Sequence, residues 1–264
     1  MVISPLVDDL RLAHVLADQA DKISMARYRA QDLKIDRKPD FTPVSDADLA
    51  VEDQIRTTLA RSRPRDAVHG EEREDTGYGE RVWVIDPIDG TSNYVRGVPV
   101  WATLVALMEN DQPVVGMVSA PALGRRWWAS RGAGAFVGRS IVASQPCHVS
   151  KVRSLDDAYL SYSEVAEWVD AGLGQQFANL MATCWRSRGF GDFWNYMLVA
   201  EGAVDLAGEP ELELHDMAAC AIIVQEAGGM FTSIDGKPGV SGPGGLASNG
   251  LLHNQALAML SADQ

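Results

Sequence analysis

Two carboxylates share one short turn in the stretch from Trp83 to Asn93. Its opening apolar run predicts a buried strand that ends at Asp86, and Asp89 follows three residues later. Two acids this close repel each other unless a cation lies between them, and Mg²⁺ demands oxygen ligands of this kind. Gly90 lets a ligand approach the backbone closely, and Thr91 adds a hydroxyl. We therefore predict metal-dependent phosphate chemistry at this turn.

Three further acids lie where predicted elements begin or end. Glu71 ends a short strand predicted over residues 67–72, and Asp216 lies in the first turn of a helix predicted over 215–225. Asp46 lies in the first turn of a helix that begins at Ser45. Helix N-termini favour ionised carboxylates, which suits metal ligands. The alternatives stay open, because Asp46 has the pattern of a simple helix-start acid and glutamate pairs are usually solvated.

A site built from these acids would hold two or more Mg²⁺ ions. Such ions lower the pKa of water and stabilise the leaving oxygen of an in-line displacement. Phosphoryl transfer then needs no protein nucleophile. The sequence contains no GxSxG, HExxH or GxxxxGK[ST] motif, and its five histidines show no ligand spacing.

Composition narrows the class of protein. The 264 residues carry a net charge of −13, so nucleic acid is a poor partner. Three cysteines without a CxxC pair fit a reducing compartment. The first ten residues lack the features of a signal peptide, and no apolar run approaches the roughly 18 residues that span a bilayer. We therefore expect a cytoplasmic protein without a membrane segment.

The pattern of elements predicts an α+β or α/β fold in a single domain over residues 1–264. A polar boundary near 139–157 separates an N-terminal α+β half, about 1–145, from a C-terminal α/β half, about 146–264. In the first half we expect a helix over 5–30, a strand over 32–36, a mobile polar loop over 73–81, and an antiparallel meander over 100–108, 114–120 and 126–137. In the second half we expect strands over 158–162, 204–207, 230–233 and 246–248, and helices over 164–181, 193–201, 215–225 and 251–260.

Three segments resemble the motifs of the inositol monophosphatase superfamily, in order and over nearly the whole chain. They are Gly70-Glu71-Glu72, Asp86-Pro87-Ile88-Asp89-Gly90-Thr91 and His215-Asp216-Met217-Ala218-Ala219. Shorter stretches resemble the actinobacterial-type histidinol-phosphate phosphatases: 95–101, 119–122, 126–128 and 191–192. The chain departs from the superfamily where His215 replaces the usual Trp and where Ser92-Asn93-Tyr94 follows the middle motif.

The resemblance implies a layered αβαβα sandwich, usually homodimeric, that binds two or three Mg²⁺ ions. The metal ligands it implies are the side chains of Glu71, Asp86, Asp89 and Asp216 and the carbonyl of Ile88. It makes Glu71 and Thr91 catalytic residues that orient the attacking water, with Asp46 helping at a more weakly held metal. The backbone N–H groups of Gly90, Thr91 and Ser92 would receive the phosphate.

Substrate choice is expected to depend on Asp192 and Glu209. The superfamily places a carboxylate seven residues before Asp216, facing the non-phosphate end of the substrate, and Glu209 has that spacing. Histidinol carries an amine and an imidazole, which two acids suit better than they suit a polyol. Both acids also fit ordinary helix-start and strand-end positions.

We predict a Mg²⁺-dependent phosphomonoesterase that hydrolyses L-histidinol phosphate to L-histidinol and phosphate in histidine biosynthesis. Inositol 1-phosphate, fructose 1,6-bisphosphate or a 3′-phosphoadenosine nucleotide is the alternative substrate on the same site. A non-catalytic regulatory protein with this fold is the alternative of another class, and Glu71 and Thr91 argue against it.

Overall fold

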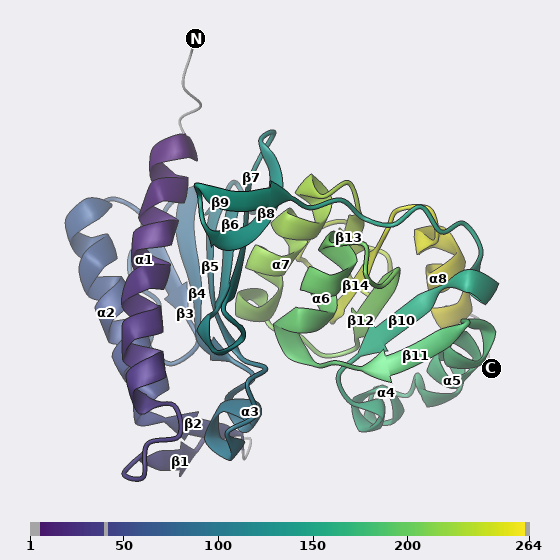
Figure 1. The fold of residues 1–264 in the computed structure, drawn as a ribbon, viewed down its shortest axis with the longest axis horizontal. Coiled ribbons are helices and arrows are strands. Elements are labelled where there is room, and N and C mark those ends of the chain that lie inside the picture. The colour runs from purple at the N-terminus through teal and green to yellow at the C-terminus, as the bar shows by residue number, and fades with distance from the viewer. Residues whose placement is uncertain (1–5, 40–41, 262–264) are drawn as a thin grey trace.

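Five layers of helices and sheets make up the computed structural model, which describes residues 6–39 and 42–261 (Figure 1). One pair of helices covers the outer face of a seven-stranded sheet, a second pair lies between the two sheets, and three helices cover a five-stranded sheet. The predicted αβαβα sandwich is confirmed. In layer order the helices are α1 (Leu6–Arg27) and α2 (Asp46–Ser62), then α6 (Asp192–Ala200) and α7 (Leu214–Glu226), then α4 (Val165–Asp170), α5 (Gly174–Thr183) and α8 (His253–Leu260).

The larger sheet runs in chain order from β3 to β9. Its strands are β3 (Ala67–Gly70), β4 (Arg81–Asp89), β5 (Ala102–Glu109), β6 (Gln112–Ala120), β7 (Arg125–Ser130), β8 (Gly134–Ser140) and β9 (Ala143–Pro146). β3 pairs with β4 in parallel and every later pair is antiparallel, so the expected meander is present. The apolar run over 126–137 is two strands, because Gly132 and Gly134 adopt positive φ and reverse the chain.

The smaller sheet has the order β11-β10-β12-β14-β13 and is mixed. Its strands are β10 (Tyr159–Tyr162), β11 (Arg186–Gly189), β12 (Leu206–Glu209), β13 (Met230–Thr232) and β14 (Gly245–Ser248). β11 has no counterpart among the predicted strands, because its Arg-Ser-Arg-Gly sequence lacks apolar alternation. The division of the chain near residue 145 stays a prediction; α7, from the second half, packs on β5 and β6 of the larger sheet.

Several local elements differ from expectation. The short strand predicted over 32–36 is β1 (Ile35–Arg37), which pairs with β2 (Pro43–Ser45). The first residue of the helix predicted over 5–30 lies outside the described residues. The loop expected to be mobile over 73–81 is tied to its surroundings, because Arg73 pairs with Asp53 of α2 and Thr76 pairs with Val68 of β3. The remaining elements are α3 (Thr91–Arg96), η1 (Pro121–Leu123) and η2 (Leu155–Asp157).

A glycine in the centre of the larger sheet sets the position of α7. A Cβ atom on Gly116 of β6 would lie 2.4 Å from the Ile222 side chain and 2.7 Å from the Ala219 carbonyl oxygen. Both distances are shorter than van der Waals contact, so only glycine lets the helix approach this closely. Ala218 and Ala219 add little bulk on the buried side of α7. The first turn of α7, which carries Asp216, is thereby held near the sheet.

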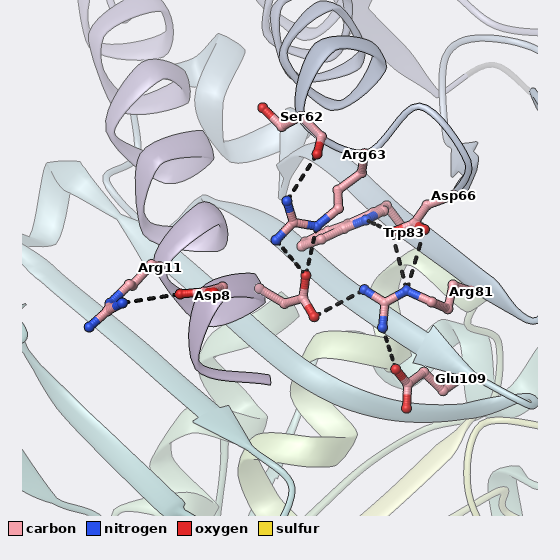
Figure 2. A network of polar contacts seen from close by, with 9 residues as sticks. Asp8, Arg11, Ser62, Arg63, Asp66, Arg81, Trp83 and Glu109 are labelled. Carbon is pink, nitrogen blue, oxygen red and sulfur yellow. Dashed lines mark hydrogen bonds and ion pairs between the residues drawn. The ribbon is translucent and has the colours of Figure 1, made fainter. Parts of the chain in front are cut away.

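The start of β4, at the end of the strand away from Asp86, is held by ion pairs to a buried carboxylate. The Asp9 carboxylate of α1 pairs with Arg63 at 2.8 Å and with Arg81 at 3.0 Å. Figure 2 shows Arg81 reaching Asp66 and Glu109 as well, while the Trp83 indole N–H donates to Asp66 at 2.9 Å. These contacts join α1, the end of α2 and the start of β4. They hold in place the strand whose other end carries Asp86.

Within residues 6–39 and 42–261, no helix combines the length and the apolar composition needed to cross a membrane.

Candidate active site

Three carboxylates from two elements converge where β4 ends and α7 begins. Asp86, Asp89 and Asp216 each offer one carboxylate oxygen, and the three atoms lie within 4.8 Å of one another. The pairing of β4 with β5 shifts register between Asp86 and Asp89, and such an irregularity re-aims side chains. Asp216 is fixed by its own helix, because its Oδ2 accepts a hydrogen bond of 2.7 Å from the backbone N–H of Glu213.

The electrostatics of these acids call for a cation. Asp86 is 2% exposed, and its Oδ1 has no hydrogen-bond partner among the described residues. Burial raises the pKa of Asp86 well above its usual range, and the charges of Glu71, Asp89 and Asp216 raise it further. The pKa of Asp89 is raised in the same way, first by burial and then by Asp192 and Asp216. The cluster offers only oxygen donors, and the three carboxylates lie close together with no ion pair to a lysine or arginine among the described residues. Such a donor set fits a hard divalent metal ion.

Glu71 faces the cluster but is engaged by a lysine. Its charge raises the pKa of Asp86, and it lines the same cavity as Asp89 and Asp216. The Lys38 ammonium lies 2.5 Å from the Glu71 carboxylate and 2.7 Å from that of Glu72. Burial opposes the charge on Lys38, but the hydrogen bonds to both glutamates outweigh it and raise the pKa of Lys38. Nothing in the sequence pattern had singled out this lysine.

The Thr91 hydroxyl lies between a carbonyl and a buried carboxylate. It is 2.9 Å from the Ile88 carbonyl oxygen and 3.2 Å from Oδ1 of Asp48. Asp48 is fully buried, and its Oδ2 accepts hydrogen bonds from the backbone N–H and the hydroxyl of Ser45. Burial raises the pKa of Asp48, against the effect of the Ser45 hydrogen bonds. Asp48 therefore connects the start of α2 to the turn that carries Thr91.

Asp46 is not brought to the acid cluster. Its carboxylate pairs with the Arg27 guanidinium at 2.8 and 3.3 Å, and it does not line the central cavity. Two residues along an α-helix turn a side chain by about 200°, so Asp46 and Asp48 face opposite sides of α2. The signal for Asp48 was present in the sequence, since its spacing from Ser45 is that of a capping box.

A cavity of about 490 Å³ extends from the metal-ligand candidates toward the second sheet. Gly90, with φ of +79°, brings the turn close to the opposite wall. A Cβ atom there would lie 3.0 Å from the Val100 carbonyl oxygen and 3.1 Å from Oδ2 of Asp192. Sequence-predicted residues that line this cavity are Glu71, Asp89, Gly90, Thr91, Ser92, Asp192, Glu209 and Asp216.

The wall of the cavity also holds both predicted specificity residues, and their charges raise the pKa of Asp89. Asp192 accepts a hydrogen bond of 2.8 Å from the Asn93 amide, and its backbone has an unusual φ of +51°. Glu209 is 5% exposed and accepts hydrogen bonds from Ser163 at 2.6 Å and from Asn195 at 3.2 Å. Burial raises the pKa of Glu209 to about 8. Burial also raises the pKa of Asp192 to about 6, with a further contribution from Asp216.

His215 lies at the rim of the site. Its Nε2 is 3.7 Å from the Asp216 carboxylate, and its ring stacks on that of His69 with centroids 6.3 Å apart. A positive charge on His215 lowers the pKa of Asp216, although burial acts more strongly in the other direction and the net shift is upward.

Fold and site together define one class of protein. The inositol monophosphatase family description matches residues 8–263, and the chain belongs to this family. It is a phosphoric monoester hydrolase that acts on a small phosphate ester. Its acidic cluster can hold a metal ion.

Two relatives and one solved structure are similar to this chain over nearly its whole length. The chain is 60% identical to a histidinol-phosphatase of Streptomyces coelicolor, over 97% of both chains. It is 53% identical to a histidinol-phosphatase of Mycobacterium tuberculosis, over 97% of this chain and 98% of that one. An inositol monophosphatase structure from Zymomonas mobilis superposes with a TM-score of 0.86 at 32% identity, covering 98% of this chain and 100% of that chain.

Proposed function

We propose that the protein hydrolyses L-histidinol phosphate to L-histidinol and phosphate with Mg²⁺. The observation that carries the proposal is a pair of carboxylates in the wall of the cavity, the buried Glu209 and the partly buried Asp192, which stand beside the metal-ligand candidates. A polyol has no positive charge to place there, whereas histidinol has an amine and an imidazole. The two histidinol-phosphatase relatives support the same substrate.

The proposed metal ligands are the carboxylates of Glu71, Asp86, Asp89 and Asp216 and the carbonyl of Ile88, for two or three Mg²⁺ ions. When bound, the ions neutralise phosphate charge and lower the pKa of water. The unneutralised oxygen cluster supports this donor set. Glu71 must then exchange its ion pair with Lys38 for the metal.

The phosphate group would lie against the backbone N–H groups of Gly90, Thr91 and Ser92, at the start of α3. The Thr91 hydroxyl donates its proton toward the Ile88 carbonyl oxygen at 2.9 Å or Oδ1 of Asp48 at 3.2 Å, which leaves the hydroxyl oxygen free to accept a hydrogen bond from water. The second proton of that water would point to the Glu71 carboxylate. One lone pair of the water oxygen then faces phosphorus in line with the leaving alkoxide.

A phosphate-release panel with Mg²⁺ tests the substrate. We expect the highest kcat/KM with L-histidinol phosphate, and lower values with inositol 1-phosphate, fructose 1,6-bisphosphate and a 3′-phosphoadenosine nucleotide. A clear preference for inositol 1-phosphate would refute the histidinol proposal. Absence of release from every ester at saturating Mg²⁺ would favour a regulatory protein with this fold.

We further propose a homodimer in the cytoplasm, without nucleic-acid or membrane partners. The three cysteines are free and buried, which fits a reducing compartment, and the net charge of −13 opposes nucleic-acid binding. Light scattering on the purified protein tests the dimer. A monomer at micromolar concentration would refute it.

A further inference from the structure

Glu167, in the short helix α4, lines the same cavity as the metal-ligand candidates. Its Oε2 is buried and has no hydrogen-bond partner among the described residues. The cavity acids beside it are already engaged: Glu209 accepts from Ser163 and Asn195, and Asp192 accepts from Asn93. Glu167 therefore lines the cavity with a carboxylate whose buried oxygen no group among the described residues satisfies.

The position of Glu167 is set by its neighbour in the chain. Trp168 is 1% exposed and stacks on Phe177 of α5, with ring centroids 4.2 Å apart and planes within 3°. Successive helix residues point about 100° apart, so a Trp168 fixed in the core holds Glu167 on a different side. Glu167 is thus a wall residue held by the core, unlike the exposed Glu164 one turn earlier.

The surroundings of Glu167 are negative. Burial raises its pKa to about 7, and the charges of Glu164, Glu211 and Asp192 raise it further. No lysine or arginine in residues 6–39 and 42–261 forms an ion pair with any of these four acids or with Glu209. A partly buried carboxylate in this setting is stabilised by a cation from outside the chain.

We propose that Glu167 is a specificity-determining residue that binds the cationic end of the substrate. The inference rests on the proposed function, and it adds a third carboxylate to Asp192 and Glu209. The Glu167 carboxylate would accept an N–H hydrogen bond from the ammonium or imidazole group of L-histidinol phosphate. An ester of a neutral alcohol has no such donor cation and gains nothing from Glu167.

The test is Glu167→Gln, which keeps the shape and removes the charge. We expect KM for L-histidinol phosphate to rise about tenfold, the equivalent of about 1.4 kcal/mol, while kcat stays within about twofold. With 4-nitrophenyl phosphate, which has no cationic group, kcat/KM should fall by much less than with L-histidinol phosphate. Calorimetry with L-histidinol alone should show a similar loss of affinity, which is a readout independent of turnover.

Matched controls separate charge from structure. Glu164→Gln removes a nearby exposed charge and should change KM by less than about twofold. Glu167→Asp keeps the charge and should recover part of the affinity that Glu167→Gln loses. An active wild type whose KM is unaffected by Glu167→Gln would overturn this inference alone. A wild type that releases no phosphate from L-histidinol phosphate would overturn the proposed function and this inference together.

Discussion

The Thr91 hydroxyl lies 3.2 Å from the Asp48 carboxylate, which joins the metal-binding turn to the first turn of α2. Asp48 is the third residue of the helix and also caps it through Ser45. Asp46, two residues earlier, faces the other way and pairs with Arg27. The first turn of α2 thus carries both a buried acid at the proposed water site and a half-buried acid that pairs with Arg27.

The first prediction compares these two acids. Asp48→Asn should lower kcat by orders of magnitude, because an amide has one acceptor oxygen and cannot accept hydrogen bonds from both Ser45 and Thr91, as the carboxylate does. Asp46→Asn removes only an ion pair with Arg27, so kcat should stay within about twofold. Steady-state kinetics that measure kcat for both variants test which of the two acids acts in catalysis. Because Asp48 also caps α2, a thermal melt must show that the variant is folded; the reverse order of effects would restore Asp46 to the catalytic role.

The second prediction concerns Asp89→Asn in the acid cluster. Removing one charge relieves repulsion with Asp192 and Asp216, so the metal-free variant should melt at a higher temperature than the metal-free wild type. Turnover should fall by orders of magnitude, and the gain in Tm on adding Mg²⁺ should shrink. Calorimetric scans with and without Mg²⁺ measure both effects. Near-normal turnover in this variant would contradict the metal-site proposal.

The third prediction concerns the ion pairs at the start of β4. Asp9→Asn leaves Arg63 and Arg81 without their shared carboxylate, and the side chain of Asp9 is only 6% exposed. We expect a loss of about 1–3 kcal/mol in the free energy of unfolding, since the arginines are partly solvated. Asp8→Asn is the matched control, because its pair with Arg11 is exposed and should contribute less than about 0.5 kcal/mol. Equal effects in urea titrations would show that burial does not matter here.

The fourth prediction concerns pH. The folded-state pKa of Glu209, about 8, lies above its ordinary value of 4.5. Between these values the folded protein binds more protons than the unfolded chain, so stability falls as pH rises from about 4.5 to 8. Glu167 and Asp192 act in the same direction, with pKa values of about 7 and 6.

Melting temperatures of the metal-free protein across this pH range provide the measurement. Glu209→Gln should flatten the curve between pH 5 and 8. A curve that rises with pH in the metal-free wild type would show that these acids are not protonated in the folded state.

The set of cluster acids followed from the sequence alone. A carboxylate after a buried strand, a second one three residues on, and an acid in a helix first turn are local patterns that need no tertiary contact. The meander and most helices could also be predicted, because the spacing of apolar residues within each segment indicates the element that it forms. The polar strand β11 was not predicted, because its residues show no apolar alternation. It is a strand because it pairs with β10 in the folded sheet.

The tertiary structure decided which groups touch. The rotation of α2 against the β4 turn selects Asp48 for Thr91, and the fold brings Lys38 onto Glu71. The packing of Trp168 on Phe177 places Glu167 in the cavity wall. These relations join residues from different elements, and their energies depend on burial and on distance between charges. Neither quantity can be read from spacing along the chain.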